Sequence, residues 1–206
     1  MLMSFVAIGG CSHRAPAPVA PEDPFVFVGF SQLPANALAG GGALLFPVGS
    51  VIFGDSVASL ALRRGDLLDR ASAVLDSVFQ RDVRGVTWHD REAIRRVLRR
   101  SPNLGPDPTD LPTGFLLAKK VEAIPDPLWA SIRALAAVTG ARVAVIPVAV
   151  RLDGREGAVT ATFAIAIVDV RLGELAWRGR VTGVAAATAE QALLLAAAAE
   201  VPTGIR

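Results

Sequence analysis

Cysteine, tyrosine and histidine are scarce in this chain, and their scarcity excludes several kinds of protein. The 206 residues include one cysteine, two histidines and no tyrosine. A single thiol leaves no intrachain disulfide, so the core alone must stabilise the fold. A metal site needs clustered His, Cys or carboxylate ligands. The one adjacent His–acid pair is His89-Asp90, and Asp90 suits a helix N-cap. We therefore expect no metal ion and no cofactor.

Glycine-rich phosphate-binding loops are also missing. The sequence contains neither a Gly-x-Gly-x-x-Gly motif nor a Walker loop. The glycines at 40–42 precede the apolar run 43–48, which predicts a strand rather than a helix. Without a helix N-terminus behind them, these glycines do not form a phosphate cradle.

No apolar run is long enough to span a membrane. The nearest candidate, Val181–Val201, is interrupted by Thr182, Thr188, Glu190, Gln191 and Glu200. A span needs roughly 20 mostly apolar residues. We interpret this stretch as a strand end followed by a buried helix, so that any membrane association must come from another part of the chain.

Excess charge is small, but the arginines are unevenly distributed. The net charge is +2, too little to indicate nucleic-acid binding. Seven arginines nevertheless fall within twenty residues, opposed by Asp82, Asp90 and Glu92: Arg81, Arg84, Arg91, Arg95, Arg96, Arg99 and Arg100. A helix over 91–100 would place the last five on one face, with Ile94, Val97 and Leu98 on the other. Two interpretations are open. The face docks on lipid headgroups or an acidic partner protein, or it is a solvated helix face without a partner.

The lone cysteine is preceded by an apolar run and two small residues, Phe5-Val6-Ala7-Ile8-Gly9-Gly10-Cys11. A lone cysteine is often a small buried hydrophobe, but this one lies at the N-terminus beside Ser12, His13 and Arg14. The run resembles the processing site of a bacterial lipoprotein. This resemblance implies that residues 1–10 are a signal peptide and that Cys11 becomes a lipid-bearing N-terminus.

A proline-rich stretch follows the cysteine. Residues 14–24 hold four prolines in eleven positions, a composition typical of an extended, semi-rigid spacer. At about 3.1 Å per residue, it would reach on the order of 30 Å. We divide the chain into a signal peptide (1–10), a lipidated cysteine with its tether (11–24) and one domain (25–206).

The remaining sequence alternates helical and strand patterns. Helices are expected over 66–80, 91–100, 126–139 and 185–199, with Asp90 capping the second, Asp126 and Pro127 opening the third and Gly140 ending it. Strands are expected over 25–30, 43–48, 83–88, 142–152, 160–168 and 175–181, with turns at 153–157 and 169–174. This order predicts an α/β sandwich: a mixed sheet ending in an antiparallel β-meander, with helices packed against it.

The second of these turns carries a recognisable pattern. Val168-Asp169-Val170-Arg171-Leu172-Gly173-Glu174-Leu175-Ala176-Trp177-Arg178-Gly179 resembles a hairpin of envelope lipoproteins. Those families include the curli secretion channel lipoprotein, lipoprotein activators of penicillin-binding proteins and TolB N-terminal-like domains. Two further segments are similar to theirs, Thr139-Gly140-Ala141-Arg142 and Leu45-Phe46-Pro47-Val48. The resemblance covers about residues 43–184 and implies scaffolding, channel formation or activation of enzymes. Asp169, Gly173 and Trp177 have structural roles in it: capping the turn, allowing positive φ and filling the core.

One motif points to catalysis instead. Val51-Ile52-Phe53-Gly54-Asp55-Ser56 resembles the first block of GDSL-type esterases, in which the serine is the nucleophile. That serine needs a general base and an oxyanion donor. The family's late Asp-x-x-His and its Gly-x-Asn-Asp block are missing. The other interpretation of Gly54-Asp55-Ser56 is a turn after a strand.

Together these patterns predict a lipid-anchored protein of the bacterial envelope, facing the periplasm and attached to the outer membrane. We expect it to bind or regulate another envelope component without catalysing a reaction, and to bind no nucleic acid. A GDSL-type esterase using Ser56 and a structural subunit of an envelope assembly are the alternatives. Oligomerisation is left open.

Overall fold

The computed structural model describes residues 30–31, 41–54, 57, 62–121 and 123–200. Cys11, the tether, Ser56 and most of the strand expected over 25–30 lie outside this part. The described strands form one seven-stranded sheet in the order β1-β7-β6-β5-β2-β4, with β3 also paired to β5. Its strands are β1 (Phe30–Ser31), β2 (Gly42–Leu45), β3 (Val51–Phe53), β4 (Thr87–His89), β5 (Ala141–Arg155), β6 (Ala158–Asp169) and β7 (Glu174–Thr182).

The sheet is mixed, as the sequence predicts. Strands β5, β6 and β7 form an antiparallel meander, whereas β2 and β3 run parallel to β5, and β4 runs parallel to β2. The first turn of the meander is tighter than the expected 153–157. Pairing continues to Arg155 opposite Ala158, so only Glu156 and Gly157 form the loop. Gly157 has φ 77°, which suits a two-residue hairpin.

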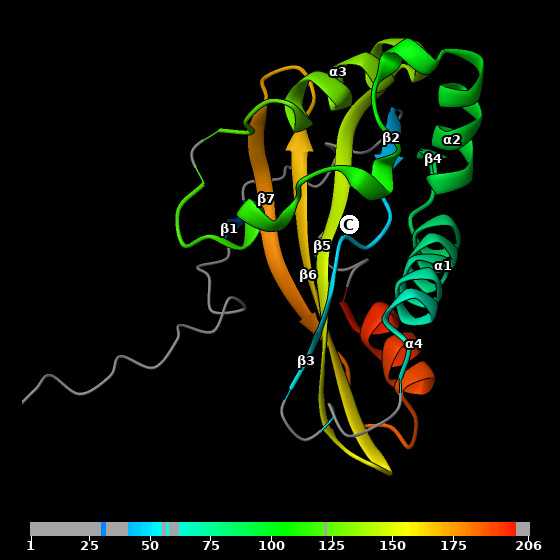
Figure 1. Cartoon of the computed structure of the whole chain (residues 1–206), viewed down its shortest axis with the longest axis vertical. Helices are drawn as coiled ribbons and strands as arrows, with labels where there is room; N and C mark the ends of the chain where they lie inside the picture. Colours follow the sequence, from blue (N-terminus) through cyan, green and yellow to red (C-terminus); the bar gives the residue numbers. More distant parts are fainter. Residues whose placement is uncertain (1–29, 32–40, 55–56, 58–61, 122, 201–206) are drawn as a thin grey trace, which may run out of the picture.

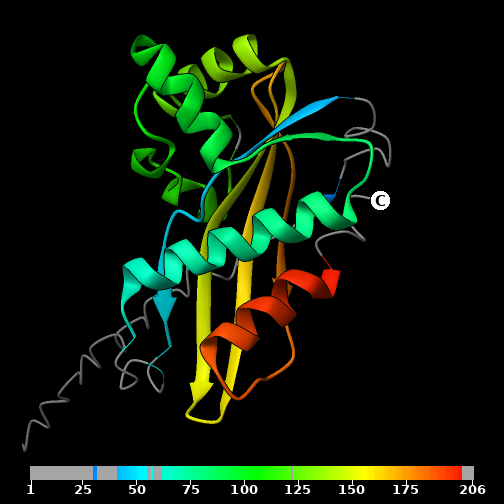
Figure 2. The ribbon, with the colours of Figure 1, turned by 90° about the vertical axis from the view of Figure 1, so that its right-hand side faces the viewer.

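The helices cover opposite faces of the sheet (Figures 1 and 2). Figure 2 views the face crossed by α1 (Arg64–Asp82) and α4 (Ala189–Glu200). The other face carries α2 (Arg91–Arg100), α3 (Leu128–Thr139) and the short 3-10 helices η1 (Pro102–Leu104), η2 (Pro108–Asp110) and η3 (Gly114–Leu117). Alternation along β5 sends Val143 and Val145 to the α1/α4 face, and Ala144 and Ile146 to the α2/α3 face. Each face therefore has its own core.

Most expected helices are confirmed, since their apolar periodicity matches a buried stripe. Leu67, Ala71 and Leu75 of α1 are buried. Helix α3 ends at Gly140, whose φ of 72° gives the left-handed C-cap that the sequence predicts. The strand expected over 83–88 is shorter and later, at Thr87–His89.

Two side chains differ from expectation. Val138 was expected to face inward with the rest of α3, but 57% of it is exposed. Position 138 lies beyond the stripe formed by Leu128, Ile132 and Leu135, so its apolar character does not indicate burial. Trp177 is half-buried rather than central, because its ring lies over Gly179 on the same side of β7. Within the stretch 181–200, β7 ends at Thr182 and α4 spans Ala189–Glu200. No helix in the described part is long and apolar enough to cross a membrane.

Candidate functional site: the arginine face of helix α2

Helix α2 begins at the cap that the sequence predicts. Asp90 Oδ1 accepts a hydrogen bond from the backbone N–H of Ala93 at 2.8 Å, and Glu92 lies in the first turn. Both carboxylates suit the positive end of the helix dipole. The other oxygen of Asp90 accepts a hydrogen bond from Gln80 Nε2 of α1 at 3.0 Å. The start of α2 is thus fixed against α1.

The helix is two-faced, as expected. Ile94 is fully buried, and Val97 and Leu98 are partly buried in the core of the α2/α3 face. The arginines lie on the other side, on the surface. The apolar side sets the rotation of α2 and therefore the direction in which the arginines project.

Three of the five arginines form ion pairs within the domain. Arg91 pairs with Asp69 of α1, Arg95 pairs with Asp107 at 3.2 Å, and Arg99 pairs with Glu92 at 2.9 Å. Asp69 and Asp107 lie outside the arginine-rich segment 81–100 in the sequence. They were therefore not among the opposing acids expected from the sequence. The arginine face is accordingly less positive than its sequence indicates.

The ion pairs differ in how firmly they hold their arginine. Burial acts to raise the pKa of Asp107, but hydrogen bonds from Thr109 and from Arg95 outweigh it and hold the pKa below its usual value. The hydrogen bond from Arg99 lowers the pKa of Glu92. Both partners in the Arg99 pair are 62% exposed, and exposed pairs contribute little to stability. Arg99 is therefore free to exchange Glu92 for another anion at low cost.

Arg96 and Arg100 remain for an outside partner. Both are exposed, and among the described residues neither pairs with a carboxylate. They lie one turn apart on the same side of α2. A cavity of about 290 Å³ is lined by other residues of this helix and the segment after it, Arg95, Leu98, Arg99, Pro102, Gly105 and Asp107, and not by Arg96 or Arg100. The two exposed guanidinium groups can bind a carboxylate or phosphate group of a partner at the surface.

His89 lies far along the sheet from Gly54, the first residue of the Gly54-Asp55-Ser56 segment. His89 of β4 pairs with Leu44, which pairs with Ala144 of β5. The backbone N–H of Gly54 donates to the carbonyl of Leu152 at 2.8 Å. Leu152 lies eight residues beyond Ala144 along β5, a separation of roughly 26 Å. Ser56 lies outside the described residues, so the esterase alternative stays a prediction.

Two ionisable groups with shifted pKa values, one buried and one half-buried, were not anticipated from the sequence. Arg178 of β7 is 3% exposed and donates to the carbonyls of Leu116, Ala118 and Lys119, holding the η3 segment against the sheet. Burial lowers its pKa. Burial also raises the pKa of Asp76 on α1 to about 6, with a further contribution from Asp90. Within the described residues, no group of three or more His, Cys, Asp or Glu could hold a metal ion.

Comparison with known proteins finds only solved structures of low similarity. No family model matches the chain, and no curated protein matches it. The LpoB C-terminal domain from Escherichia coli is 14% identical with a TM-score of 0.39, covering 70% of this chain and 83% of that one. Lipoprotein GNA1162 from Neisseria meningitidis is 14% identical with a TM-score of 0.35, covering 70% and 80%. The PelC dodecamer from Paraburkholderia phytofirmans is 13% identical with a TM-score of 0.38, covering 87% and 96%. Similarity this low supports no inference about family, partner or assembly, so the resemblance carried by the hairpin stays a prediction.

Proposed function

We propose that the chain is a lipid-anchored protein of the bacterial envelope, whose periplasm-facing α/β domain binds another envelope component without catalysing a reaction. The observation that carries this proposal is the sequence around Cys11. An apolar run and two small residues precede the cysteine, and a proline-rich spacer separates it from the domain. A spacer of this kind keeps a folded domain away from a lipid surface while leaving it free to meet a partner.

The exposed cations of α2 support an anionic partner. Arg96, Arg99 and Arg100 offer guanidinium groups that match carboxylate or phosphate oxygens two at a time. We therefore assign the binding role to this arginine face, and place the acidic surface of an envelope protein or anionic headgroups opposite it.

The anchor is tested by mass spectrometry of the membrane fraction of a bacterium that expresses the chain. Wild type should yield an N-terminal peptide that begins at Cys11 and carries acyl chains. Cys11→Ser should lose both the acyl chains and the membrane association, whereas the control His13→Ala should keep them. A chain with Met1 intact and an unmodified Cys11 thiol would overturn the anchor.

The arginine face is tested separately by crosslinking in intact cells and by binding to anionic and neutral vesicles. Arg96→Glu with Arg100→Glu should lose the contact. Arg63→Glu with Arg155→Glu changes net charge by the same amount at exposed positions away from α2, and should keep it. Equal binding by the two double variants would remove this face from the proposal and leave the anchor standing.

The absence of catalysis is tested with short-chain esters. Wild type and Ser56→Ala should hydrolyse them at the same background rate. A loss of activity confined to Ser56→Ala would restore the esterase alternative.

A further inference from the structure

The outer edge of β7 is covered over only part of its length. On one side β7 pairs with β6 from Glu174 to Thr182. On the other side, among the described strands, it pairs only with the two residues of β1, which lie opposite Trp177 and Arg178. An edge strand presents a row of backbone N–H and C=O groups that a further strand can bind. Residues 179–182 of β7 therefore offer an edge for such a strand.

The register of β1 directs the preceding chain along this edge. Strand β1 is antiparallel to β7, with Phe30 opposite Arg178 and Ser31 opposite Trp177. Each residue before Phe30 thus corresponds to one residue further along β7. Continued without a bulge, this register puts residues 29, 28, 27 and 26 opposite residues 179, 180, 181 and 182. The segment next to β1 has the direction and the length that the open edge requires.

The sequence of this segment suits a strand with two different faces. Residues 25–29 read Phe-Val-Phe-Val-Gly, and aromatic and β-branched residues favour strands. The register would place Phe27 opposite Val181, which is 4% exposed and belongs to the core of the α1/α4 face. It would place Val28 opposite Arg180, which is exposed, on the other face. The larger apolar side chain thus falls on the side of the sheet that carries a core.

Trp177 supplies a further reason for this register. Its ring lies over Gly179, where a Cβ would collide with the ring. In the continued register, the residue opposite Gly179 is Gly29, which also brings no side chain to this place. A shift of one residue would put Val28 there instead. The two glycines would therefore meet where the indole ring needs room.

We propose that residues 25–29 dock on the outer edge of β7 in the same molecule, as a continuation of β1. The occupant is the chain's own segment because Phe30 already pairs with β7 and holds that segment beside the edge. This connection gives the segment a high effective concentration, which a strand from another molecule lacks. Docking closes the edge against pairing with other chains.

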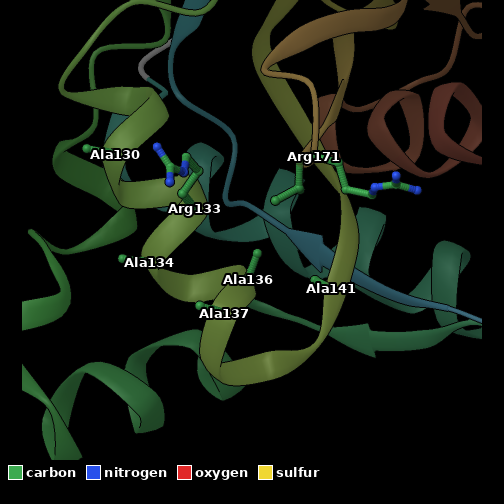
Figure 3. A pocket seen from close by; sticks show the side chains of 8 residues that line it. Ala130, Arg133, Ala134, Ala136, Ala137, Ala141 and Arg171 are labelled. Carbon is green, nitrogen blue, oxygen red and sulfur yellow. The ribbon is translucent and has the colours of Figure 1, made fainter.

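Docking would also fix where the tether leaves the domain, a consequence that rests on the lipid anchor proposed above. The continued strand runs toward Thr182, and so toward the end of the sheet that carries the β5–β6 hairpin (Figure 1). Helices α2 and α3 lie at the opposite end, where Figure 3 shows α3 beside the turn after β6 that carries Arg171. The arginine face of α2 would then lie at the end of the domain remote from the tether, which favours a partner protein over the headgroups around the anchor.

Engineered disulfides test the docking. All variants are made in the full chain with Cys11→Ser, so that the introduced cysteines are the only thiols. In Val28→Cys with Arg180→Cys, the two side chains would lie directly opposite each other on one face, within reach of a disulfide. In the matched control, Phe27→Cys with Arg180→Cys, they would lie on opposite faces of the sheet. Under mild oxidation at low protein concentration, peptide mass spectrometry should find a bridge within one molecule, at least about tenfold more often in the first variant than in the control.

Hydrogen exchange gives an independent measurement. Those amides of residues 179–182 that point away from β6 should exchange slowly in the parent, because the docked segment accepts their hydrogen bonds. Phe27→Asp places a charge against the core at Val181, and should speed their exchange at least about tenfold. Val28→Asp is the matched control, since it places the same charge on the exposed face. It should leave their exchange close to that of the parent.

Three results would overturn the proposal. Equal bridging in the two cysteine variants would show that the segment has no fixed register on β7. A bridge that links two copies, detected by mixing isotope-labelled and unlabelled protein, would show that the edge binds the segment of a second molecule. Fast exchange at residues 179–182 in the parent, unchanged by Phe27→Asp, would show that the edge is open. None of these results depends on acylation of Cys11, so the docking and the anchor can fail separately.

Discussion

The hydroxyl of Ser72 accepts a hydrogen bond from the backbone N–H of Val48 at 3.0 Å, and donates one to the carbonyl of Leu68 at 2.7 Å. Ser72 is 3% exposed and Val48 is 4% exposed. This one side chain therefore satisfies a buried amide in the segment between β2 and β3, and it connects that segment to α1.

Replacing this hydroxyl should destabilise the domain. Ser72→Ala leaves the Val48 N–H buried without a partner, at a cost of about 1–3 kcal/mol. Urea denaturation should show a lower midpoint with an unchanged slope. Ser77 is the matched control, since it makes the same bond to the residue four earlier, Ala73, but is exposed. Equal midpoints for Ser72→Ala and Ser77→Ala would contradict this role.

Asp76 should make stability depend on pH. Burial and, next, the charge of Asp90 raise its pKa to about 6 in the folded domain, from 3.8. The folded state then binds the proton more tightly than the unfolded state, so stability is highest below pH 4 for this group and is lost as the pH rises through 6. Asp76→Asn should flatten this dependence and stabilise the domain at pH 7 by about 1 kcal/mol, after allowance for solvent screening.

Thermal unfolding between pH 4 and pH 7 measures the effect. Glu156→Gln, in the exposed hairpin loop, serves as the control and should leave the pH profile of the wild type. A profile for Asp76→Asn that parallels the wild type would show that another group titrates.

Arg64 should protect an open sheet edge. Its Nη1 donates to the carbonyl of Val51 at 2.8 Å, and its guanidinium carbon lies 5.1 Å from the ring centroid of Phe53. Both residues belong to β3, which among the described strands pairs with β5 only. Arg64→Ala should lower stability by about 1 kcal/mol and increase aggregation, because an uncovered edge can pair with another chain.

Light scattering during incubation near the unfolding midpoint measures that tendency. The neighbouring Arg63→Ala removes the same charge from an exposed position and should aggregate like wild type. If Arg63→Ala aggregates equally, charge and not edge protection is responsible.

Gly183 and Gly65 should respond to alanine in opposite directions. A Cβ at Gly183 would lie 2.5 Å from the backbone nitrogen of Ala196 and 2.7 Å from its Cα, so α4 would have to move. We expect Gly183→Ala to cost about 1–3 kcal/mol. Gly65 lies in the first turn of α1 with nothing within 4 Å of a Cβ, so Gly65→Ala should stabilise by about 0.5–1 kcal/mol. A Gly183→Ala variant as stable as wild type would contradict the close approach of Gly183 to α4.

Elements set by local sequence were predictable. The stripe Leu67, Ala71 and Leu75 defines α1 by its spacing alone, and Asp90 and Gly140 mark helix ends because their side-chain chemistry acts over three or four residues. Features set by long-range packing were not predictable. The pairs of Arg91 with Asp69 and Arg95 with Asp107 depend on where α1 and η2 meet α2. The same holds for the exposed Leu194 and Leu195 of α4, since an Ala- and Leu-rich helix gives no indication of which side will face the core.

Strand β5 lies inside the sheet. It pairs with β6 on one side from Val143 to Arg155, and on its other side it pairs first with β2 and then with β3. Its central amides are therefore shielded by a neighbour on each side and by a core on each face. Amide protons in such a position exchange with solvent only when the whole domain opens, whereas those of the helices can exchange through local fraying. The free energy of global unfolding is thus readable from Val145 and Ile146, and any binding event at α2, α3 or α4 that slows their exchange acts on the entire domain.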